Sequence, residues 1–255
     1  MGIQVWYDPS QPLPDMSAAV VETVSAAPPA QAGSSQAVTS SVVAQAPDQG
    51  SLPQQAFQSA AADDIAGSSP EYRQAALAQL NAQIAQCQLC ELHASRAHAV
   101  CGEGSADARL LIISDAPLSD RAQDALFDAA EKKLLQGMLQ AIGLDLSQVY
   151  LTSLVKCMPP QRAPYTSEMI CCDDHLSAQI KLIQPAAIML LGEQASRQLL
   201  VSQKSLTDLR QRHHQHLGVP VYASYHPRDL PGSAQNKGKV WQDLLQIKHR
   251  LTKQT

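Results

Sequence analysis

The pattern of hydrophobic and polar positions divides the chain near residue 70. From residue 10 to residue 69, Ala, Ser, Gln and Pro predominate, and Phe57 is the only aromatic residue. A segment of this kind cannot bury enough apolar surface to offset the entropy lost on ordering. We therefore predict a disordered linker over residues 10–69 and a folded domain over residues 70–255.

Within the folded part, apolar runs alternate between strand length and helix length. The helical spacing of Leu77, Leu80 and Ile84 predicts a first helix that begins at Pro70. Buried-strand patterns follow at 108–114, 149–155, 186–191 and 219–225, and further helical patterns at 124–142, 167–183, 193–200 and 239–251. Strands that alternate with helices favour an α/β fold, with a mostly parallel sheet of about four strands in a three-layer α/β/α arrangement.

Charge and hydropathy argue against two classes of protein, strongly basic DNA-binding proteins and membrane proteins. Residues 1–70 contain no Lys or Arg and six acidic residues, whereas residues 71–255 hold 19 basic and 17 acidic residues. A nearly neutral domain lacks the strongly basic surface of a protein that binds DNA mainly through phosphates, so we expect DNA contact to be weak or indirect. The chain has no apolar run of membrane-spanning length and no secretory signal, so we expect a cytoplasmic protein without membrane contact.

All six cysteines lie in the predicted domain, and four of them have a spacing that indicates chemistry. Cys87 and Cys90 form a C-x2-C pair, and Cys157 and Cys172 follow much later in the chain. In a reducing compartment, spaced cysteines indicate metal or cluster ligation before disulfides. Four thiolates suit either a Zn²⁺ ion or an iron–sulfur cluster, and the spacing alone leaves both open.

Several segments resemble the iron–sulfur uracil-DNA glycosylases, the fourth family of that superfamily. The matching segments are CQLCELHASR, ARLLIISDAP, LLQGMLQAIGL, QVYLTSLVKCMPP with the E-M-I-x-C that follows, QIKLIQPAAIMLLGEQA, YHP and KVWQDLL. The resemblance covers nearly all of residues 78–250. It implies a three-layer α/β fold and a 4Fe-4S cluster on Cys87, Cys90, Cys157 and Cys172.

The same resemblance implies a base-binding pocket, but its residues depart from the family pattern. Asp115 lies in SDAPL, where the family has G-E-A-P-G, and Phe127 falls at the base-stacking position. Ser153 replaces the Asn that reads uracil, and His226 lies at the position of the catalytic His. Serine cannot offer the paired donor and acceptor of an amide, and a missing partner costs such a site orders of magnitude. We therefore expect a vestigial pocket with little or no uracil excision.

Apolar residues also gather at the amino terminus, in the segment MGIQVWYDP of residues 1–9. Trp is a frequent hot-spot residue, so we predict a docking peptide here. Its predicted contact residues are Gly2, Ile3, Val5 and Trp6. The segment resembles the amino-terminal peptide of the psi subunit of bacterial DNA polymerase III, although only Met1 precedes Gly2. Whether the true start lies upstream of Met1 stays open.

The two resemblances together give our leading hypothesis, a non-catalytic psi-like accessory subunit of the clamp loader. Such an adaptor would bind the clamp-loader collar domain through the amino-terminal peptide and the chi subunit through the folded domain. The long linker would make the second contact effectively intramolecular. The alternative hypothesis is an active iron–sulfur glycosylase that excises uracil or another deaminated base in base-excision DNA repair. A third is a plain domain stapled by Zn²⁺.

Overall fold

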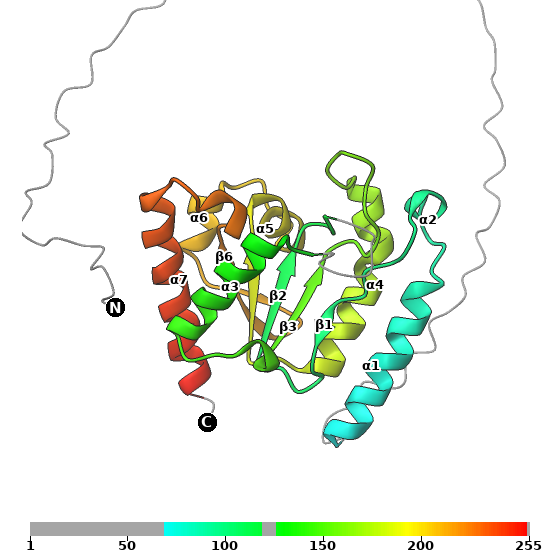
Figure 1. The fold of residues 1–255 in the computed structure, drawn as a ribbon, viewed down its shortest axis with the longest axis horizontal. Helices are drawn as coiled ribbons and strands as arrows, with labels where there is room; N and C mark the ends of the chain where they lie inside the picture. Colours follow the sequence, from blue (N-terminus) through cyan, green and yellow to red (C-terminus); the bar gives the residue numbers. More distant parts are fainter. Residues whose placement is uncertain (1–68, 119–125, 254–255) are drawn as a thin grey trace, which may run out of the picture. The chain divides into compact units, whose positions relative to one another are not determined.

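The computed structural model describes residues 69–118 and 126–253 of the chain. The predicted docking peptide at residues 1–9 and almost all of the predicted linker lie outside the described residues. The described residues form a six-stranded sheet in the order β1-β3-β2-β4-β6-β5, with helices on both faces (Figure 1).

Four strands form the parallel centre of this sheet: β2 (Leu110–Ser114), β3 (Val149–Ser153), β4 (Ala187–Leu191) and β6 (Val219–Ser224). β2 lies between β3 and β4, and β4 pairs with β6 on its other side. Two short edge strands, β1 (Glu103–Gly104) and β5 (His214–His216), run antiparallel to β3 and β6.

The prediction of a mostly parallel sheet of about four strands is therefore wrong in its strand number and pairing, because the sheet has six strands and is mixed. The two missed strands contain only two and three residues. Runs this short carry no readable hydrophobic period, and both lie where the sequence is polar.

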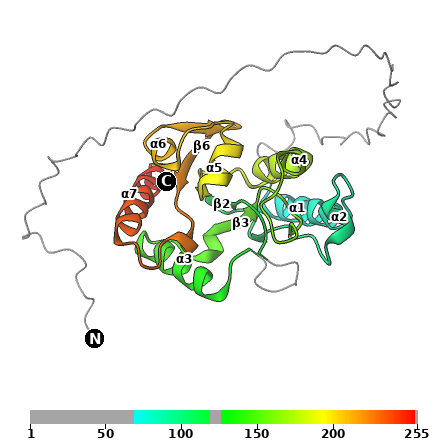
Figure 2. The ribbon, with the colours of Figure 1, turned by 90° about the horizontal axis from the view of Figure 1, so that it is seen from above.

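Helices cover both faces of the sheet, as the view from above shows (Figure 2). One face carries α1 (Pro70–Ala85), α4 (Thr166–Ile183) and α5 (Glu193–Leu199), and the other carries α3 (Ala129–Ala141) and α7 (Ala234–Thr252). Shorter elements lie in the connections: α2 (Leu92–Ser95), η1 (Leu146–Gln148), α6 (Leu206–Arg210) and η2 (Pro227–Asp229). None of the helices in the described part of the chain is long and apolar enough to cross a membrane.

The continuous apolar character of the central strands follows from burial on both faces. In β2, Leu111 and Ile113 join the apolar cluster under α1 and α4, while Leu110 and Ile112 join the cluster under α3 and α7. Successive side chains of a strand point to opposite faces, so a strand between two helical layers needs an apolar residue at every position.

The parallel strands bring several polar residues to one edge of the sheet. β2 ends at Ser114, which is in register with Ser153 at the end of β3, and β6 ends at Ser224 beside Leu191 of β4. Ligands of open α/β sheets bind at the carboxyl ends of the strands. The candidate site is therefore expected just beyond these residues.

Candidate active site

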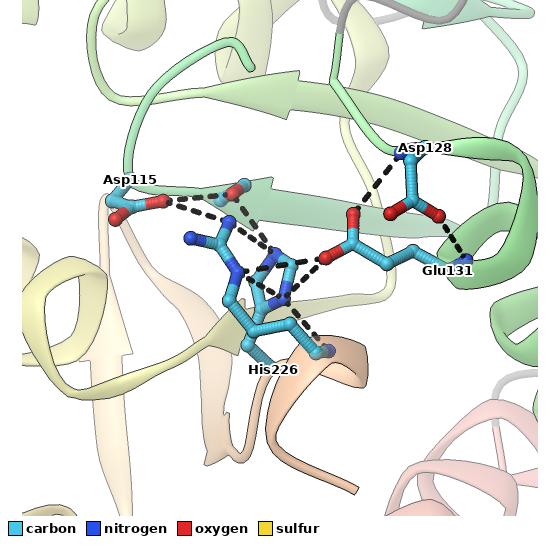
Figure 3. A network of polar contacts seen from close by, with 6 residues as sticks. Asp115, Asp128, Glu131 and His226 are labelled. Atoms are coloured by element: carbon cyan, nitrogen blue, oxygen red, sulfur yellow. Dashed lines mark hydrogen bonds and ion pairs between the residues drawn. The ribbon is translucent and has the colours of Figure 1, made fainter. Parts of the chain in front are cut away.

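His226 lies two residues beyond the end of β6, and its side chain is only 3% exposed. Its Nε2 atom is 3.4 Å from the Oγ atom of Ser114, the last residue of β2 (Figure 3). The Ser114 hydroxyl in turn donates to Oδ1 of Asp115 at 3.1 Å. The carboxyl ends of β2 and β6 thus bring an imidazole, a hydroxyl and a carboxylate together.

The protonation state of His226 follows from its neighbours. Burial, and after it the positive charge of Arg228, lower the pKa of His226 to about 4, so the ring is neutral near pH 7. The backbone N–H of Arg228 donates to Nδ1 at 3.2 Å, and the Arg228 Nε–H donates to the same atom at 2.9 Å. Because Nδ1 accepts, we assign the ring proton to Nε2, the nitrogen that faces Ser114.

Two carboxylates hold the Arg228 guanidinium beside this ring. Asp115 Oδ1 lies 3.8 Å from Arg228 Nη2, and Glu131 Oε1 lies 3.6 Å from Arg228 Nε. Glu131 Oε1 is also 3.9 Å from His226 Nδ1, which is too long for a hydrogen bond. Glu131 therefore does not hydrogen-bond to the imidazole, and the charge of Asp115 opposes the lowering of the His226 pKa by burial and Arg228.

Glu131 is fixed by the way in which α3 begins. Asp128 caps the helix, because its Oδ1 accepts from the Glu131 N–H at 2.8 Å, and Glu131 Oε2 accepts from the Asp128 N–H at 3.1 Å. This reciprocal pair is a capping box. Burial raises the pKa of Glu131, although the Asp128 hydrogen bond and Arg228 oppose the shift.

Phe127 packs against the imidazole, and Gly192 lies close to the His226 Cβ. The Phe127 ring is 1% exposed and stacks on His226 with ring centroids 5.5 Å apart and an interplanar angle of 27°. Gly192, at the start of α5, has φ +92°, and a Cβ there would lie 3.7 Å from the His226 Cβ. In this structure Phe127 thus packs as a platform under the histidine.

Ser153 takes no part in the cluster around His226. Its side chain is fully buried, and its hydroxyl donates to the Val155 carbonyl at 2.7 Å. The hydroxyl is therefore engaged by the loop that follows β3, and it replaces the Asn of the family pattern without offering an equivalent polar edge.

Sequence reasoning placed Asp115, Phe127, Ser153 and His226 in one pocket. The structure brings Asp115, Phe127 and His226 together, whereas the Ser153 hydroxyl bonds to the Val155 carbonyl. It missed the contributions of Ser114, Glu131 and Arg228. Two signals could have found them: Arg228 directly follows the YHP segment, and Glu131 stands three residues after Asp128, the spacing of a capping box.

The four candidate thiols come from three separate segments. Cys87 and Cys90 follow the end of α1, Cys157 follows β3, and Cys172 lies within α4. Arg96 links two of these segments, because its guanidinium donates to Cys157 Sγ at 2.8 Å and to the Cys87 carbonyl at 2.8 Å. The C-x2-C pair lies just beyond α1, which ends at Ala85.

The candidate thiols contribute to one another's pKa shifts. Burial, with smaller effects from Cys157 and Cys90, raises the pKa of the Cys172 thiol to about 11, although Lys156 opposes the shift. Burial raises the pKa of Cys157, and Cys87 adds to that shift. Cys171 also raises the pKa of Cys90. As they stand, no three His, Cys, Asp or Glu side chains in residues 69–118 and 126–253 are grouped closely enough to hold a metal ion.

The donor set nevertheless fits an iron–sulfur cluster chemically. Thiolates are the ligands that such clusters use. Arg96 and the fully buried Lys156 place positive charge beside the sulfur atoms, which would offset the negative charge of four thiolates. The same set of thiolates also suits Zn²⁺.

Comparison with known proteins identifies the fold. A model of the uracil DNA glycosylase superfamily matches residues 101–245. The chain belongs to this superfamily. The matched range contains β1 to β6, His226 and most of α7, so it covers the site described above.

Curated members of the uracil-DNA glycosylase superfamily extend the likeness. The Type-4 uracil-DNA glycosylase of Sulfurisphaera tokodaii is 30% identical over 162 residues, or 59% of this chain and 74% of that protein. The Type-4 enzyme of Pyrobaculum aerophilum is 30% identical over 66% of this chain and 91% of its own length. The Type-4 enzyme of Thermotoga maritima is 30% identical over 68% of this chain and 93% of its own length. The resemblance to this superfamily is thus confirmed.

The same findings overturn our leading hypothesis about function. The relatives that match across the folded domain are named as uracil-DNA glycosylases, which contradicts the prediction of a non-catalytic psi-like clamp-loader subunit. They likewise contradict the expectation that the chain is not an enzyme. No comparison supports the psi-like amino-terminal peptide, and Gly2, Ile3, Val5 and Trp6 lie outside the described residues.

Proposed function

We propose that this chain is a DNA glycosylase that hydrolyses the N-glycosidic bond of uracil or another deaminated base in DNA. The observation that supports this most directly is the buried, neutral His226 at the carboxyl edge of the sheet, with its Nε2 directed at the Ser114–Asp115 pair. The similarity of the chain to Type-4 uracil-DNA glycosylases is further support.

In this proposal the Nε2–H of His226 stabilises the departing base. When the N-glycosidic bond breaks, the bonding electrons leave with the base, and negative charge develops on its carbonyl oxygen. A preorganised N–H donor in a site that excludes water stabilises such charge strongly. A neutral imidazole can do this without giving up its proton, and Phe127 and the two Arg228 donors hold the ring in position.

Asp115 has the complementary role in the proposed reaction. Loss of the base leaves positive charge on the sugar, and water must attack the same carbon. The Asp115 side chain is 24% exposed, so it can contact both water and substrate. Its carboxylate would orient the attacking water by accepting a hydrogen bond and would stabilise the positive sugar.

The base preference follows from Ser153. Its hydroxyl is occupied by the Val155 carbonyl, so it does not offer the paired donor and acceptor with which the family's Asn reads uracil. We therefore propose a preference that is broader than, or different from, a strict preference for uracil. Hypoxanthine and xanthine, the deamination products of adenine and guanine, belong in any substrate panel for this reason.

We also propose that Cys87, Cys90, Cys157 and Cys172 bind a 4Fe-4S cluster. When bound, the cluster would supply a structural link among the segment after α1, the loop after β3 and helix α4. The support for this proposal is the thiolate donor set, the Arg96 contacts and the sequence resemblance to the iron–sulfur glycosylases.

The function is tested by measuring release of free base from oligonucleotides. The full chain is purified without oxygen from a host lacking its own uracil-DNA glycosylase, and is then mixed with strands containing uracil, hypoxanthine or xanthine. We expect release of at least one base, reduced about 100-fold or more by His226→Ala. His213→Ala, which changes an exposed histidine just before the edge strand β5, is the matched control. Silence across the panel, or equal release by both variants, would reject the proposal.

A further inference from the structure

An apolar groove lies between α3 and α7, on the outer side of one helical layer. Both views show these two helices next to each other (Figures 1 and 2). The groove has a volume of about 580 Å³, and nine of its eleven lining residues are apolar. Trp241 of α7 lines it and is 44% exposed. A large aromatic side chain in an open apolar groove is typical of an interaction surface.

Gly137 forms part of this groove, in the interior of α3. A Cβ atom built at Gly137 would meet nothing within 4 Å. Glycine is among the least favourable residues inside a helix because of its large loss of backbone entropy. The packing of the domain itself therefore gives no reason for glycine at this position. A glycine does lower the wall of the groove, so that the backbone of another chain can approach closely.

The charge of the groove points to the kind of partner. Its only charged lining residues are Lys133 on α3 and Lys237 on α7, within the part of the chain that the structure describes. A DNA strand would pair with the lysines but would leave the apolar floor uncovered. A helix with an apolar stripe and acidic flanks would cover the floor and pair with both lysines.

We propose that the α3–α7 groove binds an amphipathic α-helix of a partner protein, with acidic residues on both sides of its apolar stripe. The inference goes beyond base excision, because none of Ser114, Asp115, Phe127, Glu131, His226 or Arg228 lines the groove. An apolar stripe at helical spacing suits a groove formed by two helices, in the helix-in-groove mode of recognition.

Trp241 provides a direct reporter of occupancy. The chain has two tryptophans, Trp6 and Trp241, so Trp6→Phe leaves a single fluorophore in the groove. The probe is a synthetic helical peptide with Leu along one face and Glu on both flanks. We expect a saturable blue shift of Trp241 emission. A companion peptide with Lys in place of Glu should bind at least tenfold more weakly.

Two glycines give a matched pair of variants in the Trp6→Phe background. Gly137→Leu fills the groove and should weaken binding of the acidic peptide at least tenfold. Gly238→Leu changes another helix-interior glycine with open space around it, but Gly238 does not line the groove, so binding should be retained. Circular dichroism checks that both variants are folded. Lys133→Glu, a surface change, should weaken the acidic peptide and strengthen the Lys peptide.

Three results would overturn the proposal. One is the absence of a saturable emission change with the acidic peptide. Another is equal loss of binding in the Gly137→Leu and Gly238→Leu variants, together with no response to Lys133→Glu. The third is displacement of the acidic peptide by an undamaged DNA oligonucleotide that itself shifts Trp241 emission, which would assign the groove to nucleic acid. None of these measurements depends on glycosylase activity.

Discussion

The guanidinium of Arg228 lies along the imidazole of His226, with Nε 2.9 Å from Nδ1 and Nη2 3.1 Å from Nε2. Only one of these contacts is a hydrogen bond in the tautomer that we assign, because Nε2 carries the proton. The other places a positive charge close to the nitrogen that we propose to contact substrate. Arg228 therefore influences His226 both as a hydrogen-bond donor and as a charge.

Replacement of Arg228 should separate these two effects. In Arg228→Ala the backbone N–H of residue 228 still donates to Nδ1, so the ring should keep its proton on Nε2. The pKa of His226 should rise, because the Arg228 charge is one of the causes that lower it. NMR titration of the imidazole nitrogens measures both properties. Arg197→Ala, an exposed arginine on α5, is the control, and an unchanged pKa in Arg228→Ala would contradict the assignment.

His226 should also make folding sensitive to acid. Its pKa is about 4 in the folded chain against an ordinary value of 6.5, so the unfolded chain binds more protons between these values. His226 therefore leaves the free energy of unfolding unchanged above pH 6.5. As the pH falls from 6.5 toward 4, protonation of this histidine in the unfolded chain lowers the free energy of unfolding. The full loss is on the order of 3 kcal/mol. Urea unfolding across this range should show a flatter pH dependence for His226→Gln than for the unmodified chain, and equal slopes would refute the shift.

Arg210 and Asp243 form a buried ion pair. Replacing only one of the two residues should lower the free energy of unfolding strongly. Their side chains are 7% and 3% exposed, and Arg210 donates to both carboxylate oxygens at 2.8 and 2.7 Å. The Ser224 hydroxyl adds a third hydrogen bond to Asp243 at 2.6 Å. Arg210→Met would leave the carboxylate buried without its partner, so we expect a loss of about 3–5 kcal/mol in the free energy of unfolding.

A double variant shows whether the unpaired charge is the cause. Arg210→Met with Asp243→Leu removes both charges, so it should recover much of the stability lost in Arg210→Met alone. Arg197→Met breaks an exposed pair with Glu193 and should cost less than about 1 kcal/mol. Chemical denaturation measures all three variants. A double variant no more stable than Arg210→Met would show that packing, and not the unpaired charge, dominates.

Cluster binding gives a fourth prediction. Cys157→Ser should lose most of the iron and the visible absorption of the protein purified without oxygen, because it removes a proposed ligand. Cys101→Ser should keep both, since the Cys101 thiol instead donates to the Asn81 carbonyl at 3.3 Å and serine can do the same. A colourless protein that contains zinc would establish Zn²⁺ in place of the cluster. Equal iron content in the two variants would remove Cys157 from the proposed ligands.

The elements that sequence predicted are those with long apolar patterns. Leu110–Ser114 and Ala187–Leu191 are buried on both faces, and the strong pattern that this requires marks them as strands. His214–His216 is a strand only because it pairs with β6, and its own residues are polar. Pairing of this kind depends on tertiary contacts, so a reading along the chain does not detect it.

Some residues of the candidate site could likewise be predicted from the sequence, and others could not. Resemblance to a family placed Asp115, Phe127, Ser153 and His226 together, and the fold brings all of them except Ser153 into one cluster. The roles of Arg228 and Glu131 depend on distances of 3.6 to 3.9 Å between residues on different elements, which only the folded chain defines. The psi-like interpretation depended on a dozen amino-terminal residues and on the departures of the pocket from the family pattern, and the glycosylase relatives that match the folded domain contradict it.

The two short edge strands, β1 and β5, have a consequence for aggregation. A sheet border with a long row of free N–H and C=O groups can recruit a second molecule and start aggregation. Here one border ends in the two-residue Glu103–Gly104 and the other in the three-residue His214–His216, and each runs against its neighbour. Neither is long enough to pair extensively with another chain, so the edges of this sheet offer little for edge-to-edge aggregation, although its centre is apolar.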